Sequence, residues 1–114
     1  MKSKIDMVME SLGFEFNLKP YFNTNNSDEV FSFGYSKDEV LISFECTLDN
    51  KLQKISYYTD ANTFIGFSSA VETLNAIVNK LTLNVNEWEC YTDDTELTIY
   101  TDLEENMIDI SNML

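Results

Sequence analysis

The sequence predicts an α+β fold in which an antiparallel sheet packs against one core helix. Three observations lead to this fold class. Residues 69–82 have the apolar spacing of an amphipathic helix, residues 30–60 alternate apolar and polar side chains between short turns, and residues 87–100 have the pattern of one further hairpin. We therefore expect a meander plus a C-terminal hairpin, in the order α-β-β-β-β-α-β-β-α, within a single domain spanning residues 1–114.

The core helix has the clearest pattern in the chain. Its apolar side chains recur at steps of three and four residues and form one stripe: Ala70, Val71, Leu74, Ile77, Val78 and Leu81. The polar residues fall on the opposite side, so one face is expected to be buried and the other solvated. Ser69 and Glu72 have the spacing of a capping box, which predicts that the helix begins at Ser69. Residues 62–67 are ambiguous, since Phe64 and Phe67 continue the apolar stripe backward, but Gly66 and the capping box favour a connection.

A shorter helix and a strand are expected at the N-terminus. Ser3 is predicted to cap this helix, with Asp6 as its capping-box partner, and Gly13 to end it in a left-handed conformation. The apolar stripe of the helix consists of Ile5, Val8, Met9 and Leu12. Residues 14–19 alternate apolar and polar side chains, which predicts a strand that Pro20 ends or confines to a sheet edge.

Turn positions predict the registers of the meander. With a turn at residues 37–38, the first hairpin pairs apolar residues on one face: Tyr35 with Val40, Phe33 with Ile42, and Phe31 with Phe44. With a turn at residues 49–50, the second hairpin extends that face and sets opposite charges on the other: Phe44 with Ile55, Ile42 with Tyr57, and Glu45 with Lys54. Both hairpins place their apolar residues on the same face, and a slip of one residue would expose them.

A third hairpin and a closing helix are predicted to complete the fold. The hairpin turns around residues 93–94 and pairs Trp88 with Ile99 and Cys90 with Leu97 on the inner face. Its outer face then carries Glu87, Glu89, Tyr91, Glu96, Thr98 and Tyr100. Thr101 and Glu104 form a second capping box, which predicts a short last helix with these apolar residues: Leu103, Met107, Ile108, Ile110 and Leu114.

Composition indicates a globular chain. Hydrophobic residues make up 44% of the 114 residues and aromatic residues 13%, with one proline and three glycines. No apolar run is long enough to cross a membrane, and the first residues have no signal-peptide core, so we expect a cytoplasmic protein without a membrane partner. Cys46 and Cys90 occupy inward strand positions, where free thiols are favoured over a disulfide in that compartment.

The charge balance narrows the expected partners. Twenty acidic residues stand against seven lysines, without arginine or histidine, which gives a formal net charge of −13. From residue 87 to the end there are nine acidic residues and no basic one. Such a field repels phosphate backbones and anionic membranes, so we expect no direct nucleic-acid binding and favour a protein partner with a basic surface. For any single carboxylate, solubility alone is the simpler explanation.

Catalysis and metal binding find little support in the sequence. The absence of histidine removes the commonest general base and every Ser-His or Cys-His arrangement, and the three glycines are too isolated to form a phosphate loop. Residues 93–96 and 102–105 offer carboxylates but lack the pattern of a calcium loop, and two cysteines cannot complete an ordinary zinc site. We expect a protein that is not an enzyme and holds no cofactor or metal.

The element order also resembles that of a known family. A first helix ending in Leu12-Gly13-Phe14, an antiparallel meander, a helix with Leu74-Asn75 and Asn79-Lys80-Leu81, and the hairpin around residues 88–97 are together similar to the type III secretion chaperone fold and its YbjN-type relatives. The resemblance covers nearly the whole chain. It implies a small acidic protein, commonly a homodimer, that binds other proteins rather than catalysing a reaction.

Two protein-binding functions are therefore expected as alternatives. The first is a chaperone-like or regulatory module that holds a segment of another protein. The second is an inhibitor of the immunity, antitoxin or anti-defence kind, including those encoded by phages, whose acidic face covers a basic nucleic-acid-binding or enzyme surface. The predicted partner-binding residues combine aromatic and acidic side chains: Glu87, Glu89, Tyr91, Asp93, Asp94, Glu96, Tyr100 and Asp102. Ordinary alternation in a half-exposed sheet explains the same pattern equally well.

Overall fold

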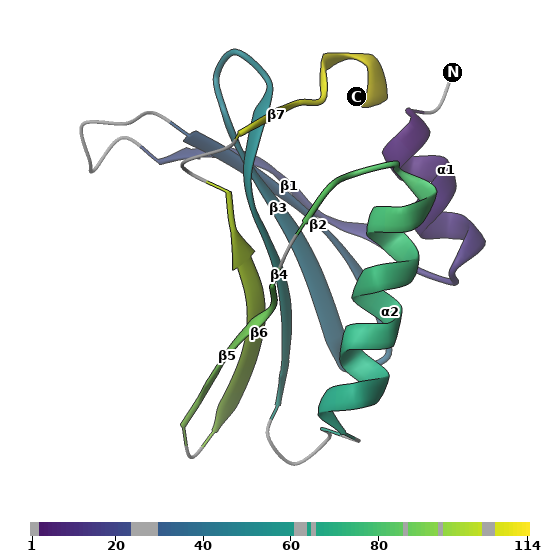
Figure 1. The fold of residues 1–114 in the computed structure, drawn as a ribbon, viewed down its shortest axis with the longest axis vertical. Helices are drawn as coiled ribbons and strands as arrows, with labels where there is room; N and C mark the ends of the chain where they lie inside the picture. The colour runs from purple at the N-terminus through teal and green to yellow at the C-terminus, as the bar shows by residue number, and fades with distance from the viewer. Residues whose placement is uncertain are drawn as a thin grey trace.

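The computed structural model describes residues 3–23, 30–60, 64, 66–85, 87–93, 95–103 and 107–114. They form an α+β fold in which both helices lie on one side of a seven-stranded antiparallel sheet (Figure 1). The elements are α1 (Lys4–Ser11), β1 (Glu15–Asn23), β2 (Val30–Lys37), β3 (Val40–Thr47), β4 (Lys51–Asp60), α2 (Phe67–Lys80), β5 (Glu89–Thr92), β6 (Glu96–Asp102), β7 (Ile108–Asp109) and a 3-10 helix (Ser111–Met113). The predicted fold class and the order α-β-β-β-β-α-β-β are confirmed.

The sheet joins the meander to the C-terminal hairpin. Its strands lie in the order β1-β2-β3-β4-β6-β5, and the short β7 pairs with the beginning of β4. Strand β4 therefore pairs with β6, although α2 and β5 separate them in the chain. This pairing brings the outward-facing residues of β4 beside those of the last hairpin. It also leaves β1 and β5 as the two edges of the sheet.

The predicted register of the second hairpin is confirmed. Phe44 lies opposite Ile55, Ile42 opposite Tyr57, and Glu45 opposite Lys54. The turn is one residue longer than predicted, because it spans residues 48–50, and Asn50, with a φ of 65° in the left-handed region, donates its N–H to the Thr47 carbonyl oxygen at 3.0 Å. Asparagine adopts this conformation more readily than most residues. A register shift next to the turn, where Cys46 lies opposite Leu52, restores the predicted pairs farther along the strands.

The predicted register of the first hairpin is wrong by two residues. The turn lies at Asp38 and Glu39, and Lys37 pairs with Val40. The apolar pairs are Tyr35 with Ile42, Phe33 with Phe44, and Phe31 with Cys46. Asp38 takes a φ of 54°, which aspartate tolerates better than lysine, so the turn is shifted one residue along the chain. A shift of two partners keeps every side chain on its predicted face.

The first helix is capped by Ser3 and ended by Gly13 as predicted, but the Asp6 carboxylate, its predicted capping-box partner, accepts the Tyr35 hydroxyl. The Ser3 hydroxyl accepts the Asp6 N–H at 3.0 Å, and Gly13 has a φ of 89°. The second helix begins earlier than expected. Helix α2 begins at Phe67 and no side chain caps it, so the capping box predicted at Ser69 is wrong. Gly66 precedes the helix with a φ of 144°, a conformation that favours glycine. Of the predicted connection, Phe67 belongs to α2, and residues 62, 63 and 65 lie outside the described residues.

The predicted closing helix is also wrong. Thr101 is buried in β6 opposite Ile55 instead of capping a helix, and Glu104 lies outside the described residues. Ile108 pairs with Leu52 of β4, and the next turn, residues 111–113, is a 3-10 helix. Ile110 is fully buried and donates its N–H to the Asn50 carbonyl oxygen at 2.9 Å. This end of the chain is therefore held by the sheet.

The last hairpin keeps its predicted faces but not its register. Cys90 lies opposite Ile99, and Thr92 opposite Leu97, because the pairing continues to Asp93, whose N–H donates to the Glu96 carbonyl oxygen, so the turn comes later than predicted. Trp88 precedes β5 and is not part of the hairpin. Cys46 is buried as predicted, and burial followed by the charge of Glu45 raises the pKa of its thiol to about 12. The inward burial predicted for Cys90 is wrong, because this residue is exposed on the edge strand. Both thiols are free.

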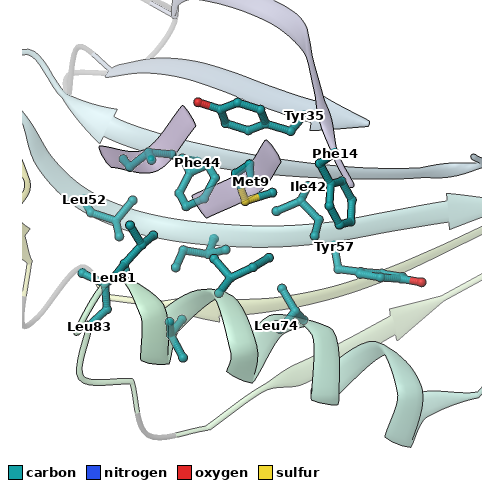
Figure 2. Close-up of a cluster of buried hydrophobic side chains, with 14 of the residues drawn as sticks. Met9, Phe14, Tyr35, Ile42, Phe44, Leu52, Tyr57, Leu74, Leu81 and Leu83 are labelled. Carbon is teal, nitrogen blue, oxygen red and sulfur yellow. The ribbon is translucent and has the colours of Figure 1, made fainter. Parts of the chain in front are cut away.

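The hydrophobic core fills the space between the helices and the inner face of the sheet (Figure 2). Met9 from α1 and Leu74 from α2 contribute side chains to the same buried cluster as Phe44 and Ile42 of β3. The amphipathic stripe of α2 is confirmed by its buried residues: Ala70, Leu74, Ile77 and Val78. The other face of the sheet carries no described helix (Figure 1).

Candidate functional site

The side of the last three strands that faces away from the helices combines tyrosines with carboxylates. We call this surface the tyrosine-carboxylate face. It comprises the residues of β4 and β6 that alternate with the buried ones, and the β5 residues that pair with them: Lys54, Ser56, Tyr58, Asp60, Glu96, Thr98, Tyr100, Asp102, Glu89 and Tyr91. The strand pairing sets Tyr58 opposite Thr98, and Tyr100 opposite Glu89. Residues far apart in the chain thus form one surface.

Two tyrosines of this face are hydrogen-bonded to carboxylates of neighbouring strands. The hydrogen bond from the Tyr58 hydroxyl to Glu96 raises the pKa of Tyr58, with smaller effects from desolvation and from the charges of Glu96, Asp60 and Asp93. The charge of Glu89 raises the pKa of Tyr100, followed by desolvation and a hydrogen bond to Glu89. Both hydroxyls therefore stay protonated at neutral pH and act as donors that fix the positions of two carboxylates.

The remaining contacts of the face involve Lys54 and Tyr91. The Lys54 ammonium lies 4.9 Å from the centroid of the Tyr100 ring, a cation-π distance. Four carboxylates on the face stand against this one lysine, so the local charge is negative. Tyr91 is 61% exposed, the largest exposed fraction among the large hydrophobic side chains of the described residues. Exposed aromatic rings beside fixed charges are typical of protein-binding hot spots.

Most of the predicted partner-binding residues lie on this face. The structure brings together five of them: Glu89, Tyr91, Glu96, Tyr100 and Asp102. Glu87 is exposed but precedes β5, so it is not on the strand where the sequence placed it. Asp93 belongs to the β5-β6 turn, and Asp94 lies outside the described residues.

Four residues of the face were missed by sequence reasoning: Lys54, Ser56, Tyr58 and Asp60. They belong to β4, and their place depends on the pairing of β4 with β6. The polar side of β4 alternates as expected for an outward face, but no local pattern identifies its neighbour in the sheet.

A second surface feature lies on α2. A shallow groove of about 530 Å³ follows its solvent side and mixes apolar and polar residues: Phe67, Ser68, Val71, Glu72, Asn75, Ala76 and Asn79. Beside it, Trp88 donates its indole N–H to the Asn75 side-chain oxygen at 2.9 Å. Phe67 is 45% exposed and offers the groove its largest apolar surface.

The chain matches no protein-family model, no curated protein and no solved structure. The resemblance to type III secretion chaperones therefore stays a prediction that rests on the order of elements.

Neither metal-binding clusters nor membrane-spanning helices are found in the part of the chain that the structure describes. Among those residues, no three Cys, Asp or Glu side chains are grouped so that they could hold a metal ion. None of the described helices is long and apolar enough to cross a membrane.

Asp93 shapes the turn that connects the two strands of the face. One of its carboxylate oxygens accepts the N–H groups of Thr95 and Glu96, each at 2.8 Å, and the Thr95 hydroxyl at 3.1 Å. The Asp93 N–H donates to the Glu96 carbonyl oxygen at 3.0 Å. The backbone hydrogen bonds from Thr95 and Glu96 lower the pKa of Asp93 below its usual value. Asp93 therefore has a structural role in addition to its charge.

This hydrogen bonding predicts a pH dependence of stability. Because the pKa of Asp93 is lower in the folded state, its contribution is present above the unfolded pKa of about 3.9 and is lost as the pH falls through the folded value. Compared with Asp93→Asn, which cannot titrate, the native protein should lose its advantage in unfolding free energy below about pH 4. Urea unfolding at pH 7 and pH 3 measures this. An NMR titration midpoint of Asp93 at or above 3.8 would contradict the prediction.

Proposed function

We propose that this protein is a non-catalytic protein-binding module that recognises a basic surface of another protein through the tyrosine-carboxylate face. The observation that carries the proposal is the pair of contacts Tyr58 to Glu96 and Tyr100 to Glu89, which span three neighbouring strands. They hold carboxylates beside aromatic rings before a partner arrives, and this preorganisation lowers the ordering cost of binding.

The chemistry of the face suits lysine and arginine side chains of a partner. Glu89 and Glu96 each offer carboxylate oxygens for charge-assisted hydrogen bonds, and the exposed ring of Tyr91 offers apolar area and a cation-π surface. The net charge of −13 adds long-range attraction, which speeds the encounter with a positively charged surface.

These properties favour a regulatory or inhibitory role. In this role the module covers a basic nucleic-acid-binding or enzyme surface of its partner, as inhibitors of the immunity, antitoxin or anti-defence kind do. The negative face then occupies the place of the partner's anionic ligand, and no reaction is needed for inhibition.

The groove on α2 supports a second candidate function, that of a chaperone-like module. An apolar client segment could lie along Phe67, Val71 and Ala76, with Asn75 and Asn79 as hydrogen-bonding groups at its sides. Such binding would depend on apolar contact rather than on charge. The two candidates therefore differ in their response to salt.

Charge reversal on the face tests the first function. We expect the double variant Glu89→Lys, Glu96→Lys to associate at least about 10-fold more slowly with a partner purified from the native host at low salt. Raising the salt concentration to about 0.5 M should slow the native protein similarly, because exposed charges are screened within a few ångströms. Stopped-flow or surface binding across a salt series measures both effects.

A matched control separates the face from overall charge. The variant Glu10→Lys, Glu15→Lys makes the same change of net charge at exposed positions away from the face and should keep most of the association rate. Indifference to salt and to the reversal of the face would contradict the acidic-face function. If Phe67→Ala then abolished binding, the groove on α2 would be the functional surface.

A further inference from the structure

The two edges of the sheet differ in how they are protected against pairing with another strand. Strand β1 contains Lys19 and Pro20, and its pairing with β2 is irregular between Phe16 and Leu18 and again between Leu18 and Tyr21. Lysine, proline and bulges are the devices by which proteins keep edge strands from accepting a further strand. The β1 edge is therefore poorly suited to pair with a further strand.

Strand β5 has none of these devices. Its residues Glu89–Thr92 contain neither proline nor lysine, pair with β6 without a register shift, and are all exposed. Tyrosine and threonine are among the residues that favour extended structure. In Figure 1, β5 forms the left border of the sheet, and within the described part of the chain no strand pairs with its outer side.

The ladder between β5 and β6 identifies the backbone groups on the open side. Asp93 donates its N–H to the Glu96 carbonyl oxygen, so residues at even spacing from Asp93, namely Tyr91 and Glu89, direct their backbone groups toward β6. Cys90 and Thr92 alternate with them and direct their N–H and C=O groups outward. Two donors and two acceptors are thus presented to an incoming strand.

The carboxylates around β5 determine which kind of strand can pair with its open edge. Exposed carboxylates of Glu87, Glu89, Asp93 and Glu96 surround the edge. A second copy of the chain would bring the same charges within the spacing of about 5 Å between neighbouring strands, where like charges repel. A segment with lysine or arginine at alternate positions would instead place its cations next to Glu89 on the tyrosine-carboxylate face.

We propose that the open edge of β5 binds an extended basic segment of a partner protein by strand addition. The backbone groups of Cys90 and Thr92 pair with the segment, and the tyrosine-carboxylate face selects its basic side chains. The inference rests on the proposed function in one respect, since both require a basic partner. It adds the conformation of the bound segment and the backbone groups that hold it.

Backbone methylation of a synthetic probe tests strand addition directly. The probe is the peptide Lys-Val-Lys-Thr-Lys-Val-Lys-Thr. It is compared with one version N-methylated at all the lysines and a second version N-methylated at all the valines and threonines. Methylation removes donors along one edge of an extended peptide without changing its charge. We expect one version to bind at least about 10-fold more weakly than the parent and the other to bind like it. Equal affinities of the two versions, or no binding of the parent at millimolar concentration, overturn strand addition.

Substitutions at Cys90 test the protein side. Cys90→Pro removes the outward N–H while leaving the groups paired with β6, so it should weaken binding of the parent peptide at least about 10-fold without a large change in Tm. Cys90→Thr keeps the N–H and should bind like the native protein. Unchanged binding by a folded Cys90→Pro overturns the proposal. If that variant does not fold, the methylated peptides decide the question.

The same measurements separate this inference from the proposed function. If the two methylated peptides bind equally well while Glu89→Lys and Glu96→Lys still weaken binding, strand addition is overturned and the acidic face remains the binding surface. If the two methylated peptides differ in affinity but the charge reversals leave binding unchanged, the result supports strand addition at β5 and contradicts the acidic-face function. A homodimer in sedimentation that Cys90→Pro dissociates would overturn the basic partner as occupant, because a second copy would then hold the edge.

Discussion

Replacing Phe44 with alanine is expected to lower the free energy of unfolding by about 3–5 kcal/mol. Its side chain is 0% exposed and lies in the buried hydrophobic cluster (Figure 2). The Phe33 ring stacks on it with centroids 5.3 Å apart, and the Tyr35 ring meets it edge-on at 6.1 Å. Truncation removes both ring contacts and leaves a cavity under two helices, where the backbone of a central strand cannot move inward to fill it.

Urea unfolding of the variant measures this loss. Phe44→Leu keeps most of the volume and should cost clearly less than the alanine substitution. Tyr91→Ala removes an aromatic ring of similar size from the exposed face of the same sheet and should change stability by less than about 1 kcal/mol. If Phe44→Ala and Tyr91→Ala cost the same, the cluster around Phe44 would not be the core of this fold.

The contrast between the two hairpins of the meander shows what the sequence can predict. Alternation of apolar residues identifies which side chains face inward, but it is unchanged by a register shift of two residues. Only turn chemistry separates such registers. Asn50 does lie in its turn, but the turn is one residue longer than predicted, and the predicted pairs hold only beyond the register shift between Glu45 and Cys46. In the first hairpin, residues 37–39 offered two adjacent turns of similar quality, and the prediction took the wrong one.

The helix boundaries show how local signals compete. The capping box at Ser69 is a valid pattern, but Gly66 provides an earlier turn, and the start at Phe67 adds residues to α2 before the buried Ala70. At the other end of the chain, Ile108 and Ile110 are two residues apart, which is the period of a strand. The sequence-based prediction gave more weight to the capping pattern of Thr101 and Glu104 and therefore expected a helix.

The tyrosine-carboxylate face could be predicted only in part for a different reason. Its β5 and β6 residues follow from local alternation within one hairpin. Tyr58, by contrast, joins the face because β4 pairs with β6 across the intervening α2, which no local pattern encodes. The hydrogen bond between Tyr58 and Glu96 links these two strands and depends wholly on that pairing.

Replacing Leu74 with alanine is expected to lower the free energy of unfolding by about 2–5 kcal/mol, because α2 is held to the sheet by its buried stripe rather than by a cap. Leu74 is 0% exposed and lies in the middle of that stripe, in the same cluster as Ile42 and Phe44 (Figure 2). Alanine has the higher helix propensity, so any loss reflects packing alone.

Denaturant unfolding of three variants isolates this packing. Leu74→Met keeps the volume and should cost less than about 1.5 kcal/mol, and Glu72→Ala, on the solvent side of the same helix, should stay within about 0.5 kcal/mol of the native protein. A loss below about 1 kcal/mol for Leu74→Ala would mean that α2 is docked on the surface. The sheet would then have to be stable without α2, and the core would have to depend on α1 and the inner strand residues.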